Sequence, residues 1–223
     1  MGGERPERSD EKVPTRSTAA TIAGKKTPTM GQTTVALALL LASPSSCSSL
    51  AARKANLLAA LTDANQGRVL SKRPQVDALI ELVEELNPQP RPLEMAPEKL
   101  SARWRLVYTT SSSILGMRRP RPFRPRPRIF QHIDVARLEA KNEEWILGGL
   151  VKNAVRAKLT PRTDGRTVDV GFTQFRVGGI PFNVGPGRFK GVLETTFLDD
   201  ELRISRGDRG NLFVLVREGP PAV

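Results

Sequence analysis

The densest group of side chains able to do acid–base chemistry lies near the C-terminus, where Asp199, Asp200 and Glu201 are followed by Asp208. Paired carboxylates can act as general acid and general base when their surroundings separate their pKa values. These acids, however, fall in or beside the turns of a hairpin, where such residues commonly bond the turn backbone. The basic residues available to pair with them are Arg203, Arg206 and Arg209. We therefore predict structural roles for the acids.

The other candidates for chemistry are isolated from one another. The chain has one cysteine, Cys47, and one histidine, His132, which cannot make a disulfide framework or a thiolate zinc site. No Ser-Asp constellation accompanies His132. The glycines in V-G-G-I-P-F-N-V-G-P-G, residues 177–187, are not followed by the G-K-[ST] of a phosphate loop and are interpreted as turns. The sequence predicts no catalytic site, no metal site and no cofactor.

The elements that position the acids are β-strands. Two apolar runs, 202–205 and 212–216, flank a turn with Gly207, Asp208 and Gly210, a pattern that predicts a β-hairpin. Short runs separated by turn residues such as Lys141-Asn142 continue upstream. The predicted strands are 103–109, 129–135, 138–140, 144–147, 151–159, 166–172 and 189–197. Their regular spacing predicts a mainly β protein, an up-and-down antiparallel β-barrel of about eight strands.

The closing hairpin and the strand before it carry a long motif. Residues 193–218 are L-E-T-T-F-L-D-D-E-L-R-I-S-R-G-D-R-G-N-L-F-V-L-V-R-E. This resembles the end of the plastid lipid-associated protein/fibrillin (PAP/fibrillin) family, with its R-I-x-R-G-D-x-G-N-L-F-V-L. The strand beginning at Trp104 resembles the family's opening strand and, more distantly, the G-x-W strand of lipocalins, with Ala102 in place of the glycine. The resemblance covers about 53–217 and implies a lipocalin-like barrel.

Helices are expected before the barrel. Apolar residues recur at helical spacing in 53–67 and again in 74–87, where Pro74 suits the first turn of a helix. The proline-rich stretch 87–97 predicts a stiff connector. We therefore predict two α-helices followed by the barrel. The expected domain is 53–218, with a helical pair at 53–87, the barrel at 101–218 and a tail at 219–223.

Alternation along the strands and the resemblance together define a candidate ligand site inside the barrel. Side chains two apart share one face of a strand, and Phe197 is added from the motif. The candidate lining residues are Trp104, Leu106, Tyr108, Val168, Val170, Phe172 and Phe197. The lipocalin resemblance implies that Arg203 or Arg206 stacks on Trp104 and, with Asp208, closes that end. A barrel of this size either holds one small guest or is filled by its own side chains, and both remain open.

Residues 117–128, which we call the Arg/Pro segment, interrupt the strand pattern. Its prolines exclude helix and ladder pairing and favour an extended loop. One interpretation is a basic surface that binds an anionic lipid layer, where each basic residue contributes about 1 kcal/mol to the binding free energy. The other interpretation is a solvated loop. The residues of this candidate surface are Arg118, Arg119, Arg121, Phe123, Arg124, Arg126 and Arg128.

Residues 1–52 differ in composition from the rest. From Lys12 to Thr62 there is no acidic residue, and Ser, Thr and Ala are frequent, as in an organelle transit peptide. The apolar run 35–42 is shorter than the roughly 20 residues that cross a bilayer, but it fits the core of a signal peptide. We predict a plastid-targeting leader, transit or bipartite, with Met30 as an alternative start. A disordered tail is the alternative.

Charge and resemblance lead to three functional hypotheses. The net charge of +12 favours anionic partners. The resemblance implies a noncatalytic protein that binds or organises prenylquinones, carotenoids or fatty acids at plastoglobules or thylakoid membranes. The alternative, also implied by the family, is a protein partner of a prenylquinone-biosynthesis enzyme. Nucleic-acid binding by the Arg/Pro segment is a weaker alternative, because one aromatic residue offers little stacking surface.

Overall fold

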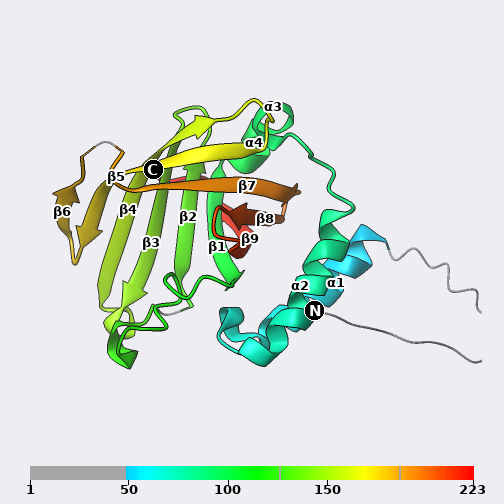
Figure 1. Cartoon of the computed structure of the whole chain (residues 1–223), viewed down its shortest axis with the longest axis horizontal. Coiled ribbons are helices and arrows are strands. Elements are labelled where there is room, and N and C mark those ends of the chain that lie inside the picture. Colours follow the sequence, from blue (N-terminus) through cyan, green and yellow to red (C-terminus); the bar gives the residue numbers. More distant parts are fainter. Residues whose placement is uncertain (1–48, 126, 186) are drawn as a thin grey trace, which may run out of the picture. The chain divides into compact units, whose positions relative to one another are not determined.

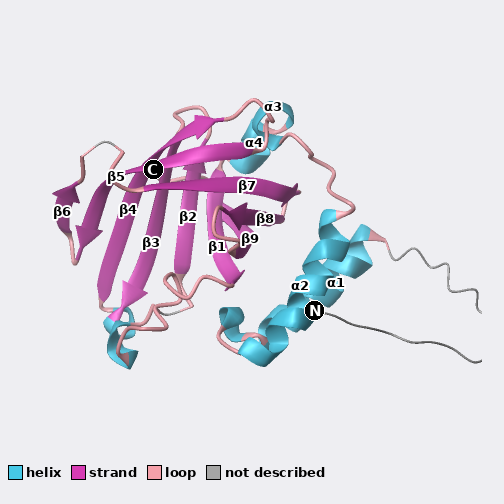
Figure 2. Ribbon diagram, in the orientation of Figure 1, coloured by secondary structure: helices cyan, strands magenta, loops and turns pink. Residues whose placement is uncertain are grey.

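The computed structural model describes residues 49–125, 127–185 and 187–223. Almost all of the expected leader, and Arg126 of the Arg/Pro segment, therefore lie outside the described residues. All of the described residues belong to one compact unit. The fold of that unit is mainly β, with its helices on the N-terminal side of the strands (Figure 2).

Two longer helices come first. Helix α1 (Leu50–Asp63) begins after Ser49, whose side chain accepts a hydrogen bond from the Ala52 amide at 3.4 Å, as an N-cap residue does. Helix α2 (Arg73–Glu84) has a proline in its first turn. The predicted connector contains two single-turn helices, α3 (Pro92–Met95) and α4 (Pro97–Leu100). The prolines there start helical turns instead of keeping the connector extended.

Nine strands follow. Their bounds are β1 (Ala102–Thr109), β2 (Ile129–Asp134), β3 (Glu139–Ile146), β4 (Val151–Pro161), β5 (Thr167–Val177), β6 (Ile180–Asn183), β7 (Lys190–Leu198), β8 (Leu202–Gly207) and β9 (Leu212–Gly219). The order β4-β3-β2-β1-β9-β8-β7-β5 is closed by a β4–β5 pairing (Figure 1). This confirms the predicted eight-stranded antiparallel barrel. Strand β6 is outside the ring and pairs with β5 alone.

Two expectations about the strands are wrong. The Lys141-Asn142 pair does not make a turn but lies inside β3, opposite His132 and Gln131 of β2. Pairing with a strand on each side of β3 overrides the local turn preference. The second error is β6 (Ile180–Asn183), since we interpreted the glycines of residues 177–187 as turns and predicted no strand between them. Pro181 is tolerated because β6 is an edge strand.

The barrel wall has two buried faces. The inner face contains Trp104, Leu106 and Val168. The outer face of β1, β7, β8 and β9 packs against the apolar sides of α1 and α2, and this layer includes Tyr108 and Phe197. Simple alternation predicts Tyr108 on the Trp104 face. Register shifts between Leu106 and Tyr108 and between Thr195 and Phe197 move both aromatic rings to the helix side, because a bulge changes the parity of a strand.

Candidate functional site

The barrel interior contains a small cavity with a volume of about 30 Å³. Three predicted lining residues, Val168, Val170 and Phe172, contribute to its wall. Its lining also includes the polar side chains of Gln131, Asn142 and Thr195, which the sequence analysis missed. One probe-sized volume of roughly 10–15 Å³ admits a water molecule. The cavity therefore has room for a small polar group, while an acyl or isoprenoid chain needs lining side chains to move.

Trp104 is packed into the inner core of the barrel. Its ring is fully buried, and its Nε1 donates a hydrogen bond to the Leu100 carbonyl at 3.0 Å. The guanidinium carbons of Arg203 and Arg217 lie 5.1 Å and 5.0 Å from the ring centroid, within cation–π range. Arg217 also donates to the Lys99 carbonyl. Trp104 and its neighbour Leu106 are thus packed into the core beside the cavity and are absent from its lining.

Arg203 is the most unusual group in this interior. It is fully buried on β8 and donates to the Gln131 side-chain oxygen, while its Nε and Nη1 have no hydrogen-bond partner among the described residues. Burial lowers the pKa of Arg203 to about 9, so it stays charged at neutral pH. Buried cations are normally paired with an acid. Here no described carboxylate bonds it, which leaves a positive charge available to an electron-rich oxygen.

A short polar chain connects Arg203 to the cavity. Gln131 accepts from Arg203 and donates through Nε2 to the Asn142 side-chain oxygen at 3.1 Å. Both amides line the cavity. On the other wall, Thr195 lies opposite Ser205, whose buried hydroxyl has no partner among the described residues. A pocket that is mainly apolar with a few converging polar groups is the usual form of a small-molecule site.

The other two residues expected to close the barrel end lie elsewhere. Arg206 points to the helix side and pairs with Glu84 of α2, Nη2 to Oε2 at 2.5 Å. Glu84 also accepts from the Thr196 hydroxyl at 2.5 Å. Asp208 is exposed in the β8–β9 turn, and its backbone amide donates to the Val192 carbonyl at 3.2 Å. Of the three, only Arg203 stacks on Trp104.

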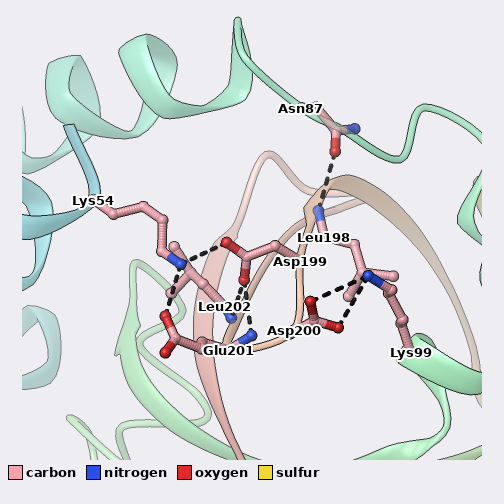
Figure 3. Close-up of polar contacts among 8 residues, drawn as sticks. All are labelled: Lys54, Asn87, Lys99, Leu198, Asp199, Asp200, Glu201 and Leu202. Atoms are coloured by element: carbon pink, nitrogen blue, oxygen red, sulfur yellow. Dashed lines mark hydrogen bonds and ion pairs between the residues drawn. The ribbon is translucent and has the colours of Figure 1, made fainter. Parts of the chain in front are cut away.

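The acidic cluster forms the turn between β7 and β8, and its partners are lysines (Figure 3). Lys54 of α1 reaches Asp199 at 2.5 Å and Glu201 at 2.9 Å, while Lys99 of α4 pairs with Asp200 at 3.0 Å. Asp199 also accepts from the Glu201 and Leu202 amides at 2.8 and 2.7 Å. The expected pairing with the hairpin arginines is wrong. These acids connect the turn to the helices.

The Arg/Pro segment is folded against the domain more than an extended loop would be. Residues Arg121–Phe123 make one 3₁₀ turn. Arg124 donates to the carbonyls of Arg119 and Met117, and Arg119 pairs with Glu144 of β3 at 2.8 Å. Short tight turns accept proline where a longer helix does not. The candidates that remain exposed are Arg118, Arg121, Phe123 and Arg128.

His132 lies on the outer wall of the barrel, under the C-terminal tail. Its Nδ1 accepts from the Ala222 amide at 3.1 Å, and its Nε2 lies 3.4 Å from Glu143. Burial lowers its pKa despite the nearby carboxylate. In the described part of the chain, no group of three or more His, Cys, Asp or Glu residues is arranged to hold a metal. None of the described helices has the length and apolar character needed to cross a bilayer.

Known proteins are similar to this chain over about three quarters of its length. Probable plastid-lipid-associated protein 5, chloroplastic, of Arabidopsis thaliana is 35% identical over 166 residues, covering 73% of this chain and 68% of that protein. Two further relatives are 29% identical: light-induced protein, chloroplastic, of Solanum tuberosum (75% and 68% covered) and chromoplast-specific carotenoid-associated protein C1, chromoplastic, of an Oncidium hybrid cultivar (72% and 66% covered). No solved structure matches the chain.

The family comparison covers both the helices and the barrel. The PAP_fibrillin model matches residues 51–179 and 174–216. The matched residues include the strand with Trp104 and the closing hairpin, the two segments that carried the resemblance in the sequence. They also include the residues that line the cavity. The chain belongs to the PAP_fibrillin family of plastid lipid-associated proteins.

Proposed function

We propose that this plastid lipid-associated protein is noncatalytic and binds the oxygen-bearing end of an apolar plastid molecule inside its barrel. The observation that carries the proposal is the buried charge of Arg203, which no described acid neutralises, beside a mainly apolar cavity. A carboxylate or a quinone carbonyl oxygen is the partner that such a guanidinium lacks. Fatty acids and prenylquinones carry these groups.

The names of the relatives support the setting. Plastid-lipid-associated and carotenoid-associated proteins, all termed chloroplastic or chromoplastic, fit a plastid location. Within the plastid, we propose that the protein acts at plastoglobules or thylakoid membranes. Among the three ligand classes expected from the sequence, the polar chain from Arg203 through Gln131 to Asn142 favours molecules with a carbonyl or carboxylate over hydrocarbon carotenoids. In an apolar site, leaving these polar groups unpaired has a cost that a hydrocarbon cannot offset.

The small volume of the cavity has a consequence for binding. A head group fits into about 30 Å³, but a chain enters only if side chains such as Phe172 change rotamer. Each methylene transferred from water to the interior contributes about 0.8 kcal/mol, part of which opposes that rearrangement. We therefore expect ligand binding to change the side-chain packing around Phe172 measurably. We also expect binding to be slower than binding to an open, preformed pocket.

The test is a titration of the full chain with a fatty acid, its methyl ester, a short-chain plastoquinone analogue and β-carotene, followed by tryptophan emission. The Trp145→Phe variant isolates the signal of Trp104, which contacts Arg203. We expect the acid and the quinone to bind more tightly than the ester and the hydrocarbon. Equal affinity for all four compounds contradicts the role of Arg203. If none of them binds, the alternative of a partner for a prenylquinone-biosynthesis enzyme replaces this proposal.

A further inference from the structure

The second half of β5 pairs with β6 on one edge and, as far as Arg176, with β4 of the barrel ring on the other. We call residues 175–183 the β5–β6 ribbon. Phe175 lies opposite Phe182, and Val177 lies opposite Ile180. Residues directly opposite in an antiparallel pair point to the same side, as do residues two apart in a strand. The four side chains therefore share one face of the ribbon. In Figure 1 this ribbon is the β6 edge, on the side of the barrel away from α1 and α2.

This face is apolar and open to solvent. The exposed fractions are 51% for Val177, 62% for Ile180 and 54% for Phe182. Phe189, which is 45% exposed, extends the face, with its ring centroid 5.7 Å from that of Phe175. Contiguous exposed apolar side chains mark a binding surface, whereas single ones do not.

The apolar face continues into the barrel. The ring of Phe175 lies 6.2 Å from that of Phe172, which lines the cavity. Phe175 also lies opposite Val155 of β4, another cavity residue. Phe172 and Phe175 thus connect the cavity wall with the apolar side of the ribbon.

Basic groups lie on the other side of the ribbon and at one edge of the apolar face. Arg188 lies over the Phe189 ring at 5.8 Å, and Arg176 occupies the opposite side of the ribbon. Next to Arg176, the outer wall of β3, β4 and β5 has a hollow of about 420 Å³ whose lining includes Lys141, Lys152 and Arg156, with Glu143 paired to both lysines. The ribbon therefore has an apolar side and a mainly basic side, a combination that is complementary to anionic headgroups over an apolar layer.

The Arg/Pro segment is at the same end of the barrel. Arg119 pairs with Glu144, and Glu144 also accepts a hydrogen bond from the side-chain amide of Asn153 at 3.1 Å. The side-chain oxygen of Asn153 in turn accepts a hydrogen bond at 3.2 Å from the backbone amide of Gly178, which lies in the turn of the ribbon. The exposed arginines of that segment therefore stand near the ribbon turn and add to its positive field.

We propose that the β5–β6 ribbon is the element that inserts into an anionic lipid surface, with Val177, Ile180, Phe182 and Phe189 in the apolar layer and the basic groups at the headgroups. Because the inserted face is continuous with the cavity wall through Phe175 and Phe172, the ribbon delivers or collects the molecule that the barrel holds. This delivery step rests on the proposed function; the insertion itself does not.

The test uses the full chain and vesicles of phosphatidylcholine with and without phosphatidylglycerol. The double variant Ile180→Ser/Phe182→Ser should lower the partition onto anionic vesicles at least about tenfold, because burial of one such side chain is enough for a factor of about ten. The matched control is Leu70→Ser/Met95→Ser, which removes two apolar side chains of similar exposure, 60% and 58%, far from the ribbon in sequence. The control should bind like the wild type.

The two proposals fail in different ways. Ligand titration in vesicle-free buffer should be unchanged in the ribbon variant, since Arg203 and the cavity polar groups are intact. If the variant and the wild type partition equally, or if neither binds anionic vesicles, ribbon insertion is wrong whatever the titration shows. If the wild type sediments as a dimer that the variant converts to a monomer, with vesicle binding unchanged, the face is a contact between copies and the proposal is overturned.

Discussion

Replacing the buried arginine by a hydrophobic residue of similar length tests whether Arg203 is kept for function. Burial lowers its pKa to about 9, well below the usual value of an arginine. At 1.36 kcal/mol per pKa unit, this corresponds to about 5 kcal/mol against the charged form. The cation–π contact with Trp104 returns about 2 kcal/mol. The charge-assisted hydrogen bond to Gln131 returns about 1.5–3 kcal/mol. The favourable and unfavourable contributions nearly cancel.

Arg203→Met should therefore change the free energy of unfolding by no more than about 1.5 kcal/mol. The matched control is Leu198→Ala, because Leu198 is fully buried on the same inner face and lies opposite Arg203 in the β7–β8 register. A buried leucine truncated to alanine loses about 2–5 kcal/mol. Urea unfolding of the two variants and the wild type, followed by circular dichroism, gives both values.

The same variant should lose ligand binding selectively. Without the guanidinium, affinity for a fatty acid should fall at least about tenfold, while affinity for its methyl ester should change little, because the ester offers no charge to pair. A loss of more than about 3 kcal/mol in Arg203→Met would mean that Arg203 is needed for the fold. Unchanged fatty-acid affinity would remove the basis of the proposed function.

Four further predictions address other parts of the chain. Asp199→Ala should lower the free energy of unfolding by about 1–3 kcal/mol in urea unfolding, because it removes two turn hydrogen bonds and the Lys54 pair; the exposed Asp200, changed likewise, should cost less than about 1 kcal/mol. Arg118→Gln/Arg121→Gln/Arg128→Gln should weaken anionic-vesicle binding by about 1 kcal/mol per residue and leave the melting temperature unchanged; equal cosedimentation at low salt contradicts this. Because burial lowers the His132 pKa below 6.5, the unfolded chain binds more protons as the pH falls through that value, so the free energy of unfolding should decrease there, and His132→Gln should flatten this dependence. N-terminal sequencing of the protein from isolated plastids should find a start between Ser43 and Arg53, and recovery of 13–30 in the mature form would show that the leader prediction is wrong.

The strand and helix pattern could be predicted because it depends on local alternation. Period-two alternation and the closing motif located most strands of the ring, and helical spacing located α1 and α2. For the site, Val168, Val170 and Phe172 were placed in the cavity wall by alternation alone. No such signal existed for Gln131, Asn142 and Thr195, since a polar residue inside a strand is usually assigned to the solvent side.

The remaining errors come from pairing between distant strands. Lys141-Asn142 has the composition of a turn, but β2 and β4 pair with it on both sides and keep it extended. The ribbon was missed because Gly178, Gly179 and Pro181 suppress the strand signal, while an edge strand tolerates them. In both places the sequence within a few residues does not contain the partner strand that decides the conformation.

The bulges explain how one barrel wall serves two cores. Without the shift after Leu106, Tyr108 would point inward; with it, the ring lies under α2, and its hydroxyl donates to Asp77 at 3.0 Å. The shift before Phe197 moves that ring to the same helix-facing layer. Two large aromatic side chains are thus outside the barrel interior, and they form part of the apolar surface against which α1 and α2 pack. The space left inside is lined by Gln131, Asn142 and Thr195, and Gln131 bonds the buried Arg203. The bulges that attach the helices therefore also leave polar groups in the interior to which a head group can bind.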